Sequence, residues 1–361
     1  MSFVSGLDLN ERFFFEVVRP FLQQHFPKLR YAAARIGSGS EVLGFDTAMS
    51  ADHDWGPHFQ LFLRQDDHEA YADQIRKRLR HELPLSFLGY STHYAEPGED
   101  GTSILTEKTS GLVNHRVQIL TVRQFCWDYL AYDCDKAPTV TDWLTISQQL
   151  LLGLTAGRVF VDEVGELTAV RDTFSYFPHD IWLYLLAAQW GRIAEEQAFV
   201  GRAAGVGDEI GSRLLAGRLV HDMMQLCFLM ERQYVPYPKW FGSGFKRLAC
   251  AETMEPLLTA VLQADDFPSR EEALCAAYEQ AAKMHNQLGV AEPVDTGVRW
   301  FHDRPFRISA ADDCGAALRA VIKDETVRAI GIHLGSIDQF SHSTVLRSYP
   351  RLRPPLHGLY K

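Results

Sequence analysis

The chain has 361 residues, of which 46% are hydrophobic and 23% are charged, and its 36 Lys and Arg against 46 Asp and Glu give a net charge of −10. This composition is that of a protein with a packed core, and it excludes a disordered, collagen-like or coiled-coil chain. A negative surface repels phosphate backbones, which argues against a sequence-independent nucleic-acid binder. The length predicts two domains or three.

Six cysteines are scattered along the chain without a C-x-x-C pair, a pattern typical of reduced thiols in an intracellular protein. The N-terminal segment carries acidic residues among its apolar ones and lacks the basic start of a signal peptide. The longest apolar run, 181–190, is far shorter than the roughly 20 residues of a membrane-spanning helix. We therefore expect a cytoplasmic protein with no membrane partner.

The first part of the chain mixes helix and strand patterns. A helix capped by Asp8 or Asn10 is expected to end at Pro27, and a second helix to run over 66–79. Extended runs are predicted over 31–36, 59–63 and 115–120. This alternation predicts an α/β or α+β domain, which we assign to residues 1–135.

From Thr139 the pattern becomes helical, beginning with a helix capped by Thr141 or Asp142. We expect a small hairpin of 159–161 and 166–168 about Gly165, followed by long helices over 178–202, 208–234, 245–263 and 269–288. Apolar residues at helical spacing predict a helical bundle, assigned to 136–290. Residues 291–361 are expected to be an extension of short elements that packs on the bundle or on a cleft.

The sequence GSGSEVLG at 37–44, followed by SADHDWGP at 50–57, combines residue types suited to phosphate chemistry. A Gly-Ser turn after a strand exposes backbone N–H groups, and the hydroxyls of Ser38 and Ser40 add donors for phosphate oxygens. Asp52 and Asp54 alternate, so in an extended segment both carboxylates project from one face and attract a divalent cation. Either half alone favours a turn capped by acids, whereas both in this order favour phosphoryl or nucleotidyl transfer.

This order resembles the signature of the DNA-polymerase-beta-like nucleotidyltransferase superfamily, in which a strand, Gly-Ser, a short helix and a loop precede Ser-Asp-x-Asp on the next strand. Gly37 and Ser38 match the first half, and 50–54 match the second with Ala51 as an extra residue. The whole chain resembles an uncharacterised bacterial branch, domain of unknown function 4037, through GSGSEVLGFD, SADHDWGP, LTAGRVF, SYFPHDIWLYLLAAQW, LMERQYVPYPKWFG and GSIDQF. The resemblance implies an α+β fold, with a nucleotidyltransferase-fold mixed sheet and helices followed by a helical bundle.

The resemblance also implies ligands. Asp52 and Asp54 would bind two Mg²⁺ ions, and Gly37 and Ser38, with Ser40 beside them, would hold the triphosphate of an NTP, with ATP favoured.

Active relatives carry a third carboxylate on a later strand, and the best-matching strand here, 116–120, offers Gln118. An amide cannot act as a base at neutral pH. Either another acid serves, with Glu163, Glu166 and Glu107 nearest in sequence, or the transferase activity is weak or absent. We take Glu166 as the third catalytic residue, with Asp52 and Asp54.

A second cluster, 230–242, combines cations with aromatic side chains ahead of Lys246 and Arg247. In the aminoglycoside-modifying nucleotidyltransferases that this arrangement resembles, the helical domain supplies a lysine to the triphosphate, and Lys239 is our candidate because flanking prolines fix its backbone. The alternative is a solvated loop whose aromatics cover the end of the bundle. Both interpretations stay open.

We therefore expect a nucleotidyltransferase that moves NMP, with AMP favoured, from an NTP to a hydroxyl of a small polar or cationic acceptor, with Mg²⁺ and release of pyrophosphate. The aromatic residues Tyr234, Tyr237 and Trp240, with Tyr176 or Trp182, suit an amino sugar. The alternative class is a non-catalytic nucleotide-binding or interaction protein that retains the fold. Nucleotide addition to RNA is disfavoured by the net charge.

Overall fold

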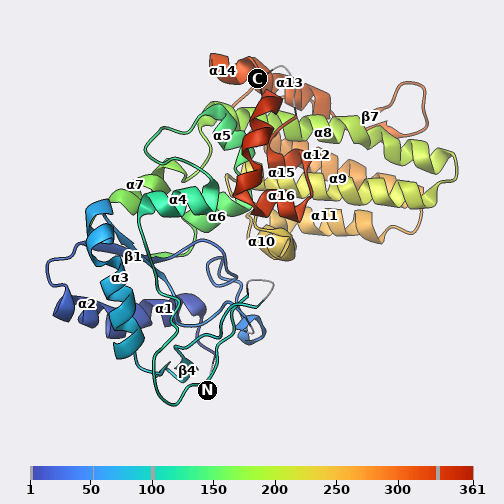
Figure 1. Ribbon diagram of the computed structural model, residues 1–361. Coiled ribbons are helices and arrows are strands. Elements are labelled where there is room, and N and C mark those ends of the chain that lie inside the picture. The colour runs from blue at the N-terminus through green and yellow to red at the C-terminus, as the bar shows by residue number, and fades with distance from the viewer. Residues whose placement is uncertain (1–2, 52, 99–101, 331–333, 361) are drawn as a thin grey trace. The chain divides into compact units, whose positions relative to one another are not determined.

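The computed structural model describes residues 3–51, 53–98, 102–330 and 334–360 (Figure 1). The chain divides into two compact units, one of Met1–Ala137 with Gln149–Ser175 and the other of Pro138–Gln148 with Tyr176–Lys361. None of the helices in the described ranges combines the length and the apolar character needed to cross a membrane.

The first unit is built on a four-stranded mixed sheet with the order β5-β2-β1-β6. Its strands are β1 (Tyr31–Arg35), β2 (Gln60–Leu63), β5 (Gln118–Leu120) and β6 (Arg158–Asp162). β1 runs antiparallel to both of its neighbours, whereas β2 and β5 are parallel. Every residue of β1 and β2 is buried, as expected of strands in the middle of a sheet that is covered on both faces.

The predicted hairpin about Gly165 is wrong. Its first half is β6, which pairs with β1 in the main sheet, and its second half is the start of helix α7 (Glu166–Thr173). The carboxylate of Asp162 explains this, because it accepts hydrogen bonds from the N–H groups of Val164 at 3.1 Å, Gly165 at 2.6 Å and Thr168 at 2.9 Å. These bonds turn the chain and satisfy the first N–H groups of a helix rather than those of a returning strand.

Helices surround this sheet. The first begins at Gly6, earlier than predicted, because the Ser5 hydroxyl accepts a hydrogen bond from the Asp8 N–H at 3.2 Å. The helices are α1 (Gly6–Phe13), a π-helical turn (Phe14–Val18), α2 (Arg19–His25), α3 (Gln65–Glu82), α4 (Val122–Leu130) and α6 (Gln148–Thr155). One apolar core joins α1, α2 and α3 to the sheet through side chains such as Phe14, Phe59 and Ile75. Two small ribbon strands, β3 (Ser86–Phe87) and β4 (Tyr90–Ser91), complete this unit.

The second unit is a helical bundle. Its long helices are α8 (His179–Gly205), α9 (Glu209–Met230), α11 (Ala251–Gln263), α12 (Phe267–Gln287) and α13 (Ala311–Val321). Figure 1 shows α8, α9, α11 and α12 lying along one another, and α9 contacts each of the other three. The shorter elements are α5 (Val140–Thr145), α10 (Phe241–Phe245), α14 (Glu325–Arg328), α15 (Ile337–Phe340), α16 (Thr344–Ser348), β7 (Arg299–Trp300) and β8 (Arg307–Ile308). The predicted α+β class, a mixed sheet with helices followed by a helical bundle, is confirmed.

The GSIDQF sequence at 335–340 packs on this bundle. It forms α15, whose Gln339 side chain donates hydrogen bonds to the Leu185 carbonyl and to Gln189 Oε1, both at 2.9 Å. Both partners lie on α8, and all three side chains are buried. The motif therefore serves to dock the C-terminal part of the chain on α8.

Gly153 of α6 shows how closely this helix approaches the turn after β1. A Cβ atom at this position would lie 2.0 Å from the Tyr129 hydroxyl oxygen and 2.7 Å from the Gly37 carbonyl oxygen. We expect Gly153→Ala to lower the free energy of unfolding by about 2 kcal/mol, because the clash outweighs the higher helix propensity of alanine. The measurement is urea denaturation.

Gly217 of α9 provides the matched control, since a Cβ atom there would meet no atom within 4 Å. Gly217→Ala should raise the free energy of unfolding by about 0.5–1 kcal/mol. If Gly153→Ala and Gly217→Ala raise the free energy of unfolding equally, α6 does not approach the turn as closely as described.

Candidate functional site

The predicted phosphate-binding turn lies at the C-terminal end of β1. Gly37 has φ +88° and Gly39 has φ +140°, conformations that residues with a Cβ atom rarely adopt. The N–H group of Gly37 donates to the Gly153 carbonyl at 2.8 Å, which ties the turn to α6. On the other side, the turn lies against α4, since a Cβ atom at Gly37 would lie 3.7 Å from ring atoms of both Phe125 and Tyr129. Ser38 itself is exposed.

A buried group of charges lies beneath this turn. Arg35, Glu41 and His58 are 4%, 2% and 7% exposed. The Arg35 Nε donates to Glu41 Oε1 at 2.9 Å, and His58 Nε2 lies 3.3 Å from the same oxygen. The Arg35 guanidinium also donates to the carbonyls of Ile36 at 2.7 Å and Ser38 at 2.6 Å. One cation therefore holds the carbonyls of the turn, and one carboxylate holds that cation.

The same charges explain why glycine is needed at position 39. A Cβ atom there would lie 2.6 Å from Arg35 Nη2 and from both carboxylate oxygens of Glu41. Such a contact is shorter than the van der Waals separation of packed atoms, and relieving it would require Arg35 and Glu41 to move apart and break their ion pair. The turn and the ion pair therefore depend on one another.

The buried charges have fixed protonation states at neutral pH. Burial alone would raise the pKa of Glu41, but the charge of Arg35 and the hydrogen bond with His58 outweigh it and hold this pKa at about 2. Burial, and then the Arg35 charge, lower the pKa of His58 to about 4. Glu41 is therefore ionised and His58 is neutral.

Two amide side chains lie beside the turn on the neighbouring strands. Gln60 of β2 is opposite Ala34 of β1 and is also paired in register with Gln118 of β5. The Gln60 Oε1 accepts from the Ile36 N–H at 3.2 Å, and its Nε2 donates to Gln118 Oε1 at 3.1 Å. Gln118 thus lies near the turn, at the position where the resemblance implies a carboxylate, and it is an amide that cannot take a proton.

The predicted acidic half of the site differs from the expectation. Asp52 lies outside the described residues. Asp54 was expected in an extended segment, but its φ is +48° and β2 begins only at Gln60, so the expected extended conformation is wrong for Asp54. The Asp54 N–H donates to the Ser103 carbonyl at 2.9 Å, and its Oδ1 accepts from the Ser103 N–H at 3.2 Å.

The Asp54 carboxylate already has a cationic partner. It forms an ion pair with Arg116 of the segment before β5, and the Arg116 guanidinium lies 5.4 Å from the centre of the Tyr94 ring. The Asp54 side chain is 41% exposed, so solvent and ions still reach it. Within the described ranges, no group of three His, Cys, Asp or Glu side chains is placed to hold a metal ion.

Glu166 does not lie with the other predicted site residues. β6 is antiparallel to β1, with Asp162 opposite Ala32 and Arg158 opposite Arg35. Residues that follow Asp162 therefore lie at the end of the sheet where β1 begins, whereas Gly37 follows its other end. About five strand residues at roughly 3.3 Å each separate the two ends. Glu166 is the exposed first residue of α7 in this position.

Lys239 belongs to the second unit, in a short 3₁₀ turn (Pro238–Trp240). It is exposed, and its Nζ lies 4.9 Å from the centre of the Trp240 ring. The Trp240 Nε1 donates to the Tyr237 hydroxyl at 2.6 Å. These three side chains form a polar and aromatic surface at the end of α9.

The other aromatic residues predicted for an acceptor pocket pack inside this unit. Tyr234 is buried against Tyr176 and Phe177, with ring centres 5.0 and 5.2 Å apart. Trp182 is buried and donates its Nε1 to the Leu229 carbonyl at 2.7 Å. Both Tyr234 and Trp182 are therefore core residues, and the expectation that they line a pocket is wrong for them.

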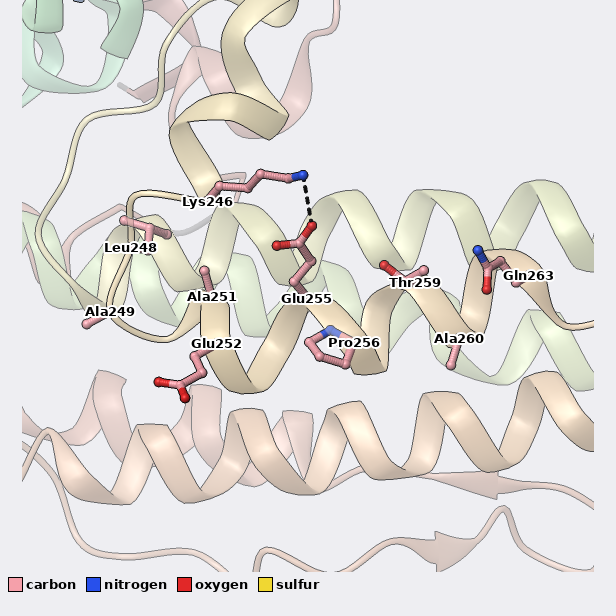
Figure 2. Close-up of a pocket in the computed structure, with 10 residues that line it drawn as sticks. All are labelled: Lys246, Leu248, Ala249, Ala251, Glu252, Glu255, Pro256, Thr259, Ala260 and Gln263. Atoms are coloured by element: carbon pink, nitrogen blue, oxygen red, sulfur yellow. Dashed lines mark ion pairs between the residues drawn. The ribbon is translucent and has the colours of Figure 1, made fainter.

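A separate groove runs along α11 (Figure 2) and encloses about 720 Å³. It is lined by Lys246, Leu248, Ala249, Ala251, Glu252, Glu255, Pro256, Thr259, Ala260 and Gln263. Figure 2 shows the ion pair between Lys246 and Glu255, two of the residues that line the groove. Their charged atoms are 3.1 Å apart. The groove contains none of the predicted site residues.

One known protein family matches the part of the chain from α5 to the start of α10. Residues 143–241 match a domain of unknown function, DUF4037. The resemblance to DUF4037 is thus confirmed for this part of the chain, which includes Glu166 and Lys239 and excludes the Gly37–Ser38 turn. The search of curated proteins gave no match.

Among solved structures, the chain is similar to a nucleotidyltransferase-like protein from Exiguobacterium sibiricum 255-15. The two share 10% sequence identity, the similarity covers 86% of this chain and 89% of that one, and the TM-score is 0.35.

Sequence reasoning missed the charges beneath the turn. Arg35 ends the otherwise apolar strand YAAAR, and Glu41 follows the GSGS sequence, so a pair of opposite charges on either side of a glycine-rich turn was the available signal. His58 and Gln60 carried no such signal, because their positions depend on the register of β2 against β1.

The buried charges beneath the turn should make the stability of the folded protein sensitive to acid. Since His58 has a pKa of about 4 when folded against an ordinary 6.5, the unfolded chain binds more protons between these values, and the free energy of unfolding rises with pH across this window. Acidification from pH 6.5 to 4 should cost about 3 kcal/mol through this residue. Glu41 adds a loss of the same sign below pH 4.5.

Urea denaturation at several pH values measures this effect. His58→Gln should reduce the slope between pH 6.5 and 4 without abolishing it, because burial also lowers the pKa of His115 to about 4. An unchanged slope in His58→Gln would contradict the neutral state assigned to His58.

Proposed function

We propose that the chain is a nucleotidyltransferase that moves NMP from an NTP, AMP from ATP being favoured, to a hydroxyl of a small polar or cationic acceptor, with release of pyrophosphate. We place this activity in the cytoplasm, with no membrane partner and no nucleic-acid substrate. The net charge of −10 supports the last point, since a polyanion would be repelled.

The observation that carries the proposal is the state of the N–H groups in the turn. Within the described part of the chain, no hydrogen bond reaches the N–H groups of Ser38, Gly39 and Ser40, although the carbonyl of Ser38 is held by Arg35. Successive N–H groups in an exposed turn whose carbonyls are turned inward form an anion-binding arrangement. Phosphate oxygens of an NTP suit it.

The proposed reaction is a displacement at the α-phosphorus. The acceptor oxygen forms a bond to this phosphorus, the bond from it to the oxygen that bridges to the β-phosphate breaks, and pyrophosphate leaves. The turn would hold the β- and γ-phosphates, so its N–H groups would bear the charge that develops on the leaving group. The proton of the acceptor hydroxyl would pass to water, because Gln118 cannot accept it and Glu166 lies at the far end of the sheet.

The donor chemistry of the loop suits a metal ion. Carboxylate oxygens are the ligands that Mg²⁺ prefers, and the Asp54 carboxylate is partly exposed, so a metal ion can reach it in competition with Arg116. We propose that two Mg²⁺ ions would be held by Asp52 and Asp54 together with the nucleotide. When bound, they would supply positive charge to the triphosphate.

The second candidate function is a non-catalytic nucleotide-binding protein. One observation favours it: Gln60 and Gln118 are hydrogen-bonded to one another at the strand positions beside the turn. Two amides there leave no base next to the acceptor oxygen, while the phosphate-binding turn stays intact.

Incubation with labelled ATP, Mg²⁺ and either a panel of aminated small molecules or total tRNA tests the proposed function. We expect release of pyrophosphate and transfer of AMP to one of the small molecules. Mass spectrometry would detect the increase in mass of that molecule by one AMP group. Label on RNA or on protein would contradict the acceptor class. Thermal stabilisation by MgATP without pyrophosphate release would support the non-catalytic alternative.

Replacement of the aspartates tests the proposed metal ligands. Asp52→Asn and Asp54→Asn should each abolish Mg²⁺-dependent ATP binding in calorimetry, since an amide does not neutralise the cation. Asp54→Asn should lower the stability of the ligand-free protein by no more than about 1 kcal/mol, because its ion pair is partly exposed. Unchanged MgATP affinity in both variants would show that these residues hold no metal.

Lys239 and Lys246 form a matched pair for the contribution of the helical unit. Lys239→Ala should weaken nucleotide binding by about 1–3 kcal/mol, as expected when a charge-assisted contact is removed. Lys246→Ala should have little effect, because Lys246 is already paired with Glu255. If the wild type and Lys239→Ala bind the nucleotide with equal affinity, Lys239 does not contact the nucleotide and the 230–242 cluster is a solvated loop.

A further inference from the structure

The ion pair of Asp54 and Arg116 lies at the end of the sheet where the phosphate-binding turn begins. Gln60 of β2 is opposite both Ala34 of β1 and Gln118 of β5. Arg116 precedes Gln118 by two residues, and because β5 is antiparallel to β1 these two residues lead towards the end of β1 that the turn follows. β5 is separated from β1 by one strand, a distance of about 10 Å.

Tyr94 connects this ion pair to the buried charges beneath the turn. Its ring stacks on the His58 ring, with the ring centres 6.3 Å apart and the ring planes 13° apart. The Arg116 guanidinium lies 5.4 Å from the centre of the same Tyr94 ring, and His58 Nε2 lies 3.3 Å from Glu41 Oε1. Tyr94 is 1% exposed, so its ring is a fixed support for the guanidinium.

The Arg116 guanidinium has donors available for a second partner. Its Nη1 donates to Asp54 Oδ1, and in the described part of the chain no hydrogen bond engages its Nε or its Nη2. The side chain of Arg116 is 30% exposed, so an anion in solution can reach it. Arginine keeps its proton in proteins and binds phosphate oxygens through paired N–H groups. A phosphate group is therefore a suitable alternative to the Asp54 carboxylate.

We propose that Arg116 is a nucleotide-binding residue that exchanges partners, pairing with Asp54 in the ligand-free protein and with the triphosphate when a divalent cation takes its place at Asp54. The exchange rests on the proposed function, since it uses the metal ligand and the turn assigned there. No covalent bond changes in it, and Arg116 stays protonated throughout.

Charge explains why the exchange requires both ligands. The guanidinium and a divalent cation repel one another at the same carboxylate, and without nucleotide the displaced Arg116 would exchange that carboxylate for water. The triphosphate supplies the missing negative charge, because the turn would hold it at the same end of the sheet. The metal ion and the nucleotide therefore bind cooperatively, and Arg116 couples the two binding events.

Two binding measurements on the full chain test this exchange. Mn²⁺ is the probe for the metal site, because it prefers the same oxygen ligands as Mg²⁺ and its electron paramagnetic resonance signal reports the free ion. Arg116→Gln should bind Mn²⁺ alone about tenfold more tightly than the wild type, because Asp54 loses its competing cation. In calorimetry the same variant should bind MgATP about tenfold more weakly, because a charge-assisted contact with phosphate is lost.

Three further variants isolate these effects. Arg116→Lys keeps a positive charge beside Asp54, so its affinity for Mn²⁺ should stay at the wild-type value. The double variant Asp54→Asn/Arg116→Gln should lose the added affinity for Mn²⁺, because the carboxylate that holds the ion is gone. Arg12→Gln removes the same charge from an exposed ion pair with Glu16, and it should change neither affinity.

The outcomes separate this exchange from the proposed function. If Arg116→Gln leaves the affinity for MgATP unchanged, or does not raise the affinity for Mn²⁺, the exchange is wrong and the proposed function stands. If the wild type binds no MgATP, the proposed function and the exchange are both wrong. If Arg116→Gln fails to fold, Arg116→Lys decides: it should bind MgATP more weakly, because an ammonium cannot form the paired contacts, and an unchanged affinity would overturn the exchange.

Discussion

The arrangement of the first unit around its candidate site depends on the ion pair between Arg35 and Glu41. Without the carboxylate, the guanidinium would be a buried charge with no counter-charge, a state that costs several kcal/mol. With it, the guanidinium binds two carbonyls of the turn and fixes the direction in which the N–H groups of that turn face. The pair also excludes any side chain at Gly39. The conformation of the exposed turn therefore depends on the buried ion pair beneath it.

Local sequence signals predicted the elements that such signals determine. The strands at 31–35 and 60–63 and the helix at 65–82 follow from apolar periodicity, caps and prolines, and each formed within a few residues of its expected bounds. The long helices of the bundle also formed, but the one expected over 245–263 begins only at Ala251, after the separate short helix α10 has ended at Phe245. The turn at Gly37 was also predictable, because glycine adopts at little cost the positive φ values that a sharp turn after a buried strand requires. The position of Gln118 near the turn was expected from the family resemblance rather than from local signals, and the register of β5 against β2 agrees with it.

Non-local pairing set the limit of this reasoning. Glu166 was a reasonable choice by proximity in sequence, but its location depends on which strand β6 pairs with and in which direction. Likewise, Asp54 looked like part of an alternating strand, whereas its backbone follows hydrogen bonds to Ser103, a residue far along the chain. Tyr234 and Trp182 were chosen as aromatic residues near a loop, and the packing of α8 and α9 buried them instead. In each of these cases the position of the residue depends on contacts with residues that lie far away in the sequence.

The pairing of β1 with β6 also constrains how the protein can be made and divided. Ala33 is opposite both Leu61 and Val161, so the central strand of the sheet receives its second partner only after a long stretch of chain has been synthesised. Contacts of such long sequence separation form slowly, because the entropy of closing the intervening loop is lost first. Until then, one edge of β1 offers unpaired N–H and C=O groups to any other strand. A fragment that ends before residue 158 would keep this edge permanently open, and it would associate with itself rather than remain a monomer.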